Sequence, residues 1–149
     1  MNNLIYYALA IIAGVMLSTQ AGINAQLRTA VGDPVLAALV SFMVGTAALL
    51  IYVLIFNKES VGLMDSLKGM SLYKWTGGLI GALYVTGVII VAPRIGATNA
   101  AGLIVAGQIL FALFLDHFGL LGFIQHSISY MRVAGALLLI LGVFMILKN

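Results

Sequence analysis

The sequence predicts an all-α integral membrane protein built as a bundle of five transmembrane helices. Three observations support this fold class: 63% of the 149 residues are hydrophobic, only 7% are charged, and the mean hydropathy is +1.18. A soluble domain carries roughly 25% charged residues because its surface faces water. The chain has no cysteine, and its four carboxylates and two histidines are spread along it. We therefore expect neither a disulfide, a metal site nor a cofactor.

Five apolar runs approach or exceed the roughly 20 residues that a helix needs to cross a bilayer. These runs cover residues 4–26, 35–56, 76–92, 97–118 and 132–147. Transmembrane barrel strands would alternate apolar and polar residues, so continuous runs indicate helices. Asp33 and Pro34 predict an N-cap followed by proline at the first helical position, and Pro93 is expected to end the third run. Residues 1–149 should form one transmembrane domain.

Small residues recur at four-residue spacing in every run. In lipid, helices associate where small side chains let their backbones approach closely, so these stripes predict a compact bundle. The stripes are Gly14, Ser18 and Gly22; Ala37, Ser41 and Gly45; Gly77 and Gly81; Gly102 and Ala106; and Ala134, Leu138 and Gly142.

The basic residues are almost evenly divided between the two sides of the membrane. With five spans, Lys58, Lys68, Lys74 and Arg132 lie on one side, and Arg28, Arg94 and Lys148 lie on the other. A protein of fixed orientation shows a clear Lys and Arg excess in its cytoplasmic loops. A balance of four against three is typical of a chain that inserts in both orientations. The alternative is one orientation, set by the lysines of a single short loop.

An antiparallel pair would also complete an inverted repeat. Many transporters consist of two inverted halves with the substrate site near the midplane. Five spans cannot be divided into two equal halves, so the second half would come from a second copy of the chain. We therefore expect an antiparallel homodimer of ten helices.

Several sequence stretches resemble the YdcZ-type family of the drug/metabolite transporter superfamily. They are LSTQAGINAQLR at 17–28, SFMVGT at 41–46, and residues 77–122 with their PRIGA, VAGQ and DHFGLLG segments. The resemblance implies a five-helix half-transporter of the bacterial inner membrane that moves small organic metabolites or drugs, often outward. Ile124 and Ser127 stand where members of that family tend to carry prolines, so the loop 119–131 departs from the family pattern.

Four polar residues within the runs are candidates for substrate binding, because a polar group in hydrocarbon needs a partner or a wet cavity. Gln108 lies near the centre of the fourth run, and Tyr84 near the middle of the third. Gln20 and Asn24 are four residues apart, so they share a helix face, opposite the Gly14 stripe. The alternative is that all four form hydrogen bonds between helices.

Four residues near the ends of runs are candidates for coupling or gating. Asp116 and His117 end the fourth run, where a titrating pair could couple transport to protons; alternatively, they bond to loop backbone. Arg94 could attract an anion or anchor the turn in the headgroups, and Asn99 lies just beyond that turn. The first run lacks the glutamate that small multidrug resistance proteins use for proton exchange.

The residues together with this resemblance predict transport of a small organic metabolite or drug-like molecule by alternating access, and the resemblance implies the export direction. A lining of amides, a tyrosine and apolar side chains suits a neutral or weakly charged molecule, since a bare cation would need convergent carboxylates. The expected partners are a second copy, the lipid bilayer and the substrate, and not nucleic acid, because the basic residues are scattered. The alternatives are a passive channel and an accessory membrane subunit; no enzyme activity is expected.

Overall fold

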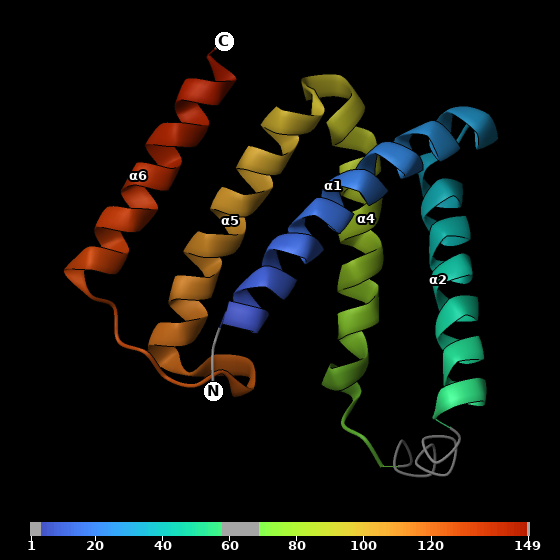
Figure 1. The fold of residues 1–149 in the computed structure, drawn as a ribbon, viewed down its shortest axis with the longest axis horizontal. Helices are drawn as coiled ribbons and strands as arrows, with labels where there is room; N and C mark the ends of the chain where they lie inside the picture. The colour runs from blue at the N-terminus through green and yellow to red at the C-terminus, as the bar shows by residue number, and fades with distance from the viewer. Residues whose placement is uncertain (1–3, 58–68, 149) are drawn as a thin grey trace. The chain divides into compact units, whose positions relative to one another are not determined.

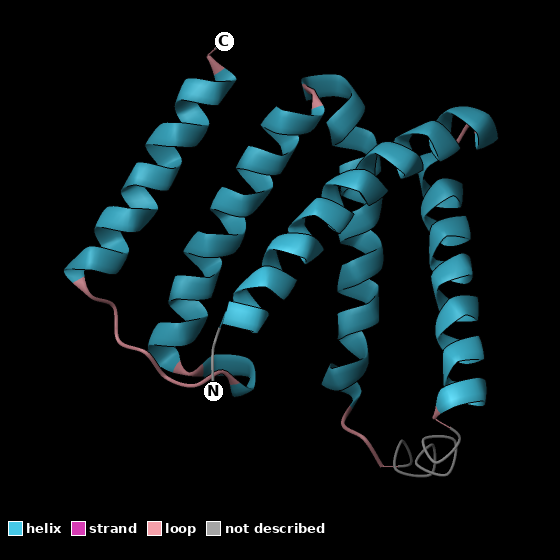
Figure 2. Ribbon diagram, viewed as in Figure 1, coloured by secondary structure: helices cyan, strands magenta, loops and turns pink. Residues whose placement is uncertain are grey.

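The computed structural model describes residues 4–57 and 69–148, and all regular structure within these ranges is helical (Figures 1 and 2). The long helices are α1 (Leu4–Val31), α2 (Pro34–Phe56), α4 (Thr76–Ile95), α5 (Ala97–Phe118) and α6 (Tyr130–Leu147), and the short 3-10 helices are η2 (Leu72–Trp75) and η3 (Leu120–Gly122). Five helices in the described ranges are long and apolar enough to span a membrane, which confirms the predicted number of helices. Lys58 and Lys68 lie outside the described residues.

The chain divides into two units, Met1–Pro93 and Arg94–Asn149, and each is treated by itself. The first contains α1, α2, η2 and most of α4, and the second contains α5, η3 and α6. That residues 1–149 form a single transmembrane domain stays a prediction.

The turn between α1 and α2 follows the predicted capping chemistry. Asp33 accepts a hydrogen bond from the backbone N–H of Leu36 at 2.7 Å, and Pro34 occupies the first helical turn. This confirms the N-cap expected from the sequence. α1 runs to Val31, five residues beyond the predicted end, because nothing interrupts it before Gly32, which adopts a left-handed φ of 80°.

Pro93 does not end the third span, contrary to the sequence prediction. α4 continues through it to Ile95 and stops at Gly96, whose φ is +89°. Proline lacks an N–H, so the carbonyl of Ile89, four residues earlier, loses its usual helical donor. The Arg28 guanidinium donates to that carbonyl at 3.2 Å instead. The helix therefore passes through the proline without leaving this buried carbonyl unpaired.

The core of the first unit lies where α1, α2 and α4 meet. Its buried residues are Ala37 and Ala38 of α2 and Val85 and Ile89 of α4, and the partly buried side chains packed against them are Leu27, Val31 and Tyr84. Two alanines at the centre allow the neighbouring helices to approach.

The small-residue stripe of α1 is not its packing face within the described chain. A methyl group at Gly14 or Gly22 would meet no atom within 4 Å, whereas Asn24, predicted on the opposite face, is 4% exposed. The reason is that the bulkier Asn24 face already packs against α4, which leaves the stripe uncovered. In α4, Gly81 faces α2, since a methyl group there would contact the Phe42 ring at 3.7 Å, whereas Gly77 meets no atom within 4 Å.

The second unit is an antiparallel pair of helices, α5 and α6. A methyl group at Gly102 would lie 3.4 Å from Val143 Cγ1, so the glycine lets the two helices pack closely. Ala100, Ala106 and Ala136 are also buried. Beside this contact runs an open apolar groove of about 460 Å³, lined by residues that include Thr98, Gly142 and Ile146.

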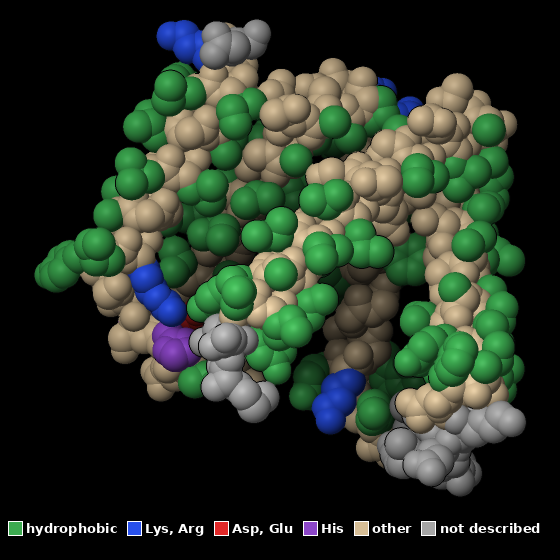
Figure 3. Space-filling model, in the orientation of Figure 1, with side chains coloured by type: hydrophobic (Ala, Val, Ile, Leu, Met, Phe, Trp, Pro, Cys, Tyr) green, Lys and Arg blue, Asp and Glu red, His purple; other side chains and the backbone are tan. Residues whose placement is uncertain are grey.

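Most large apolar side chains of the described residues are exposed. Leu83, Leu138 and Ile11, for example, expose 67%, 68% and 71% of their surface. Figure 3 shows hydrophobic side chains along the visible helix faces and Lys or Arg side chains only near helix ends. An exposed apolar surface of this extent is what lipid solvates, and water would not.

Candidate functional site

Asn24 is the one buried polar residue among those that the structure describes. Its amide forms no hydrogen bond to any described residue, and its nitrogen and oxygen are not sealed from the cavity, since every fully buried side-chain N or O atom of the described residues has a partner. It borders a small cavity between α1 and α4, lined also by Leu17, Gln20, Ala21, Tyr84, Val85 and Val88. The amide is therefore available to bind a molecule that enters this cavity.

Three of the four predicted substrate-binding residues meet at this cavity. Gln20 and Asn24 come from successive turns of α1, and Tyr84 faces them from α4. Their side chains combine two amides, each able to donate and accept, with one hydroxyl. The cavity volume is about 10 Å³, which is at the limit for one water molecule. The cavity as it stands is too small to hold an organic ligand.

Gln108 lies elsewhere, on α5 in the second unit. Its side chain is exposed and forms no hydrogen bond to a described residue, and it does not line the α5–α6 groove. Its place near the middle of a membrane-spanning helix agrees with the sequence analysis. Within its own unit it is a mid-span amide without a protein partner.

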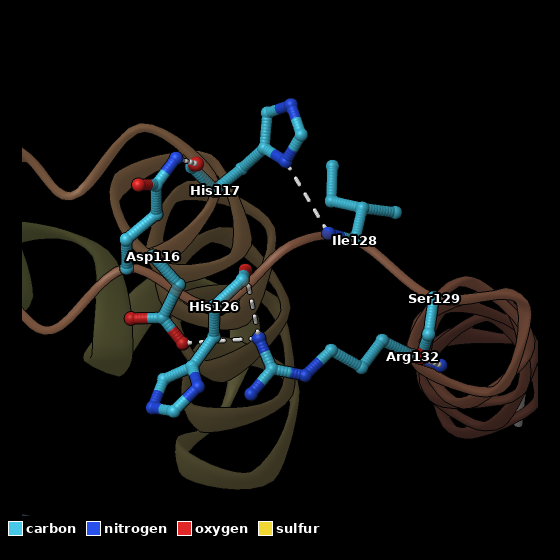
Figure 4. Close-up of polar contacts among 7 residues, drawn as sticks. Asp116, His117, His126, Ile128, Ser129 and Arg132 are labelled. Carbon is cyan, nitrogen blue, oxygen red and sulfur yellow. Dashed lines mark hydrogen bonds and ion pairs between the residues drawn. The ribbon is translucent and has the colours of Figure 1, made fainter.

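Asp116 and His117 belong to a polar cluster at the end of α5 (Figure 4). The Asp116 carboxylate forms an ion pair with Arg132 of α6 at 3.3 Å, and the Arg132 guanidinium also donates to the backbone carbonyl of His126. The backbone N–H of His126 donates in turn to the Asp116 carbonyl at 2.8 Å. These contacts connect the end of α5, the following loop and the start of α6.

The His117 imidazole forms a hydrogen bond to the same loop. Its Nδ1 accepts from the backbone N–H of Ile128 at 3.2 Å, and the Gln125 side chain donates to the His117 carbonyl at 3.0 Å. Ser129 then caps α6 by accepting from the N–H of Arg132. The loop that departs from the family's proline pattern is therefore held by hydrogen bonds. The His117 side chain thus bonds to loop backbone, as in the alternative interpretation, whereas the Asp116 carboxylate pairs with the Arg132 side chain.

Arg94 and Asn99 flank the turn between α4 and α5. The Asn99 amide donates to the Ile95 carbonyl at 2.8 Å, which satisfies one of the last carbonyls of α4. The Arg94 side chain is exposed and has no hydrogen bond to a described residue. Asn99 thus stabilises the turn, while Arg94 is free to meet headgroups or an anion.

Arg28 is the residue that the sequence analysis missed, because it was counted only as a basic residue that sets orientation. Its guanidinium is partly buried and contacts α4 one helical turn beyond Asn24. The available signal was the i, i+4 spacing of Gln20, Asn24 and Arg28, which places all three on one face. Within residues 4–57 and 69–148, no three His, Asp or Glu side chains gather as a metal site would require.

Five apolar spans with polar side chains at their packed interfaces define a polytopic helical membrane protein. The chain matches, over residues 5–145, the model of the family described as "Putative inner membrane exporter, YdcZ". It belongs to this family of inner-membrane transport proteins, as its sequence motifs suggested, and its place is the inner membrane. Neither the curated proteins nor the solved structures with which the chain was compared include a match.

Proposed function

We propose that this chain is one half of a solute carrier that exports a small organic molecule across the inner membrane. Two copies inserted in opposite orientations would form the complete ten-helix carrier, and the solute would cross by alternating access. Membership of a family described as inner-membrane exporters supports the class of activity and the direction.

The observation that carries the proposal is the amide of Asn24 at the cavity between α1 and α4. The residue is 4% exposed, and its amide has no hydrogen bond within the described chain, so its donors and acceptor face the cavity. Polar residues within membrane spans commonly mark a substrate pathway, where a ligand can supply the partner. Gln20 and Tyr84 border the same cavity and would add further hydrogen bonds.

The size of the cavity favours a carrier over a channel. Pockets for organic ligands measure about 300–1,000 Å³, whereas this cavity measures about 10 Å³. Binding of a solute of that size beside Asn24 would require α1 and α4 to move apart. A cycle of opening and closing is the defining property of alternating access, and an open pore would need no such closure.

The exposed polar and small residues support a second copy. Gln108 places an amide near the middle of a span with no partner in the described chain, and the Gly14 and Gly22 stripe of α1 is uncovered. An amide is costly against lipid, and a stripe of small residues gains no close packing there. Both would gain contacts from another helix. The near balance of basic residues would allow that helix to come from an inverted copy.

Counterflow in proteoliposomes tests the proposal even though the solute has not been identified. Vesicles containing the purified chain are loaded with an unlabelled small-molecule extract of bacterial cells and placed in the same extract labelled with ¹³C. A carrier exchanges the labelled form of its solute for the unlabelled form, and mass spectrometry identifies it. A channel would show uptake without stimulation by the internal solute, and an accessory subunit would show none; either result would contradict the proposal.

Two matched variants locate the site. Asn24→Leu should reduce the exchange at least tenfold, because it replaces the buried amide with an apolar group of similar size. Gln26→Leu makes the same kind of change two residues away, at an exposed position that does not line the cavity, and should leave exchange within twofold of the original. Equal effects of the two substitutions would remove Asn24 from the site.

A further inference from the structure

The partly buried guanidinium of Arg28 is bonded to backbone rather than to a carboxylate. One of its N–H groups donates to the carbonyl of Ile89, which is fully buried and lacks a helical donor because of Pro93. A guanidinium has five N–H donors, and none of the others has a partner among the residues that the structure describes. Most of its hydrogen-bonding capacity is therefore unused.

The positive charge of Arg28 is also not neutralised within the described chain. The ion pair that the structure shows there joins Asp116 to Arg132, in the other unit. The nearest carboxylate in the sequence, Asp33, accepts from the N–H of Leu36 at the start of α2. An unpaired charge in a partly buried site of a membrane protein is costly, and such charges usually meet a partner of opposite sign.

Arg28 does not line the candidate cavity but lies one helical turn beyond it. Arg28 follows Asn24 by one helical turn on the same face of α1, and side chains on a helix lean toward its N-terminus. The guanidinium therefore leans from the turn of Arg28 toward that of Asn24. Its partner Ile89 directly follows Val88, which lines the cavity. The Asn24 amide and the Arg28 guanidinium therefore lie on successive turns of α1, on the face that contacts α4.

We propose that Arg28 determines specificity and that the carried solute is a small organic carboxylate. This inference rests on the proposed function and refines it, since the amides alone suggested a neutral or weakly charged molecule. The planar fork of a guanidinium matches a carboxylate with two parallel hydrogen bonds. Asn24 would bind a second polar group of the solute, and Leu17, Val85 and Val88 would contact its apolar part. A lining this apolar suits a monoanion better than a strongly hydrated phosphate.

The counterflow assay tests the inference through the charge of the exchanged compounds. With the ¹³C-labelled extract, the compounds that exchange through the original protein should be carboxylates at pH 7. Exchange of only amines or neutral compounds would overturn the inference and leave the carrier proposal standing. Absence of any exchange beyond that of empty vesicles would overturn both.

Two substitutions of Arg28 show whether this residue recognises the solute or only stabilises the fold. Arg28→Gln should reduce carboxylate exchange at least tenfold, and more than it reduces exchange of any neutral compound, whereas Arg28→Lys keeps the charge and should retain a measurable part. If both substitutions lowered every compound equally, Arg28 would have a structural role only, and the inference would fail.

Replacing Pro93 gives a variant in which the effect of Arg28 on the solute can be measured without its contribution to the fold. Pro93→Ala provides the N–H that Ile89 otherwise lacks, so the backbone no longer needs Arg28. Adding Arg28→Gln to Pro93→Ala should still reduce carboxylate exchange at least tenfold relative to Pro93→Ala alone. Carboxylate exchange within twofold of Pro93→Ala would contradict a role of Arg28 in recognition.

Discussion

The contact between Arg28 and Ile89 leads to a prediction about stability that does not depend on the identity of the solute. Arg28→Met keeps most of the apolar stem and removes the donor, so the buried Ile89 carbonyl would be left unpaired beside Pro93. A hydrogen bond to a charged group contributes about 1.5–3 kcal/mol. Because the bond is 3.2 Å long, we expect a loss of about 1.5 kcal/mol in the free energy of unfolding.

The same substitution should cost much less when Pro93 is replaced. Pro93→Ala restores a backbone N–H four residues after Ile89, which pairs the carbonyl within α4. In that background Arg28→Met should cost about 0.5 kcal/mol or less, so the double-mutant cycle should give a coupling of about 1 kcal/mol. The cost of Arg28→Met is smaller in the Pro93→Ala background because the restored backbone N–H pairs the Ile89 carbonyl, which then no longer needs the Arg28 donor.

The free energy of unfolding of the original protein, the two single variants and the double variant can be measured in mixed micelles of increasing SDS content. The chain has a single tryptophan, Trp75, which ends η2 just before α4, so its fluorescence reports on the first unit. Additive effects of the two substitutions, within about 0.3 kcal/mol, would refute the idea that Arg28 replaces the donor that proline lacks.

Three further predictions concern the second unit. Gly102→Leu should destabilise the α5–α6 pair by about 1–3 kcal/mol through overpacking, whereas Gly107→Leu, at a position with open space, should not; thermal unfolding of both variants checks this, and equal melting temperatures would contradict the packing. Asp116→Asn should cost at most about 1 kcal/mol, because the pair with Arg132 is about one-third exposed, and a larger loss in the same assay would show that the pair is more than a surface contact. Ser129→Ala should remove the α6 cap and cost about 1 kcal/mol, with faster amide hydrogen exchange confined to the first turn of α6; uniform protection would argue against the cap.

The number and type of the helices could be predicted because continuous apolar runs leave few alternatives in a membrane. The start of α2 was equally predictable, since Asp33 and Pro34 act through neighbouring atoms. The course of α4 through Pro93 was not, because it depends on a donor from Arg28, a residue 61 positions away from the carbonyl. The local sequence shows that Pro93 lacks a donor, but it does not show that Arg28 supplies one in its place.

The candidate site shows the same division. The spacing of Gln20 and Asn24 predicted a shared face, and the structure places Tyr84 beside them. The small-residue stripe of Gly14 and Gly22 indicated a packing face, but a stripe does not say whether its partner is in the same chain. The role of Arg28 depends on which helix faces it, and a charge count along the sequence contains no such information.

The central claim is that two oppositely inserted copies form the carrier, and labelling of the C-terminus tests it most directly. The chain has no cysteine, so Asn149→Cys introduces a single thiol that a membrane-impermeant maleimide reaches only from outside in intact cells. Because four basic residues oppose three, the positive-inside rule gives little preference, and we expect about half of the chains to be labelled from outside. Labelling of all chains, or of none, from outside would show one orientation and contradict the antiparallel homodimer.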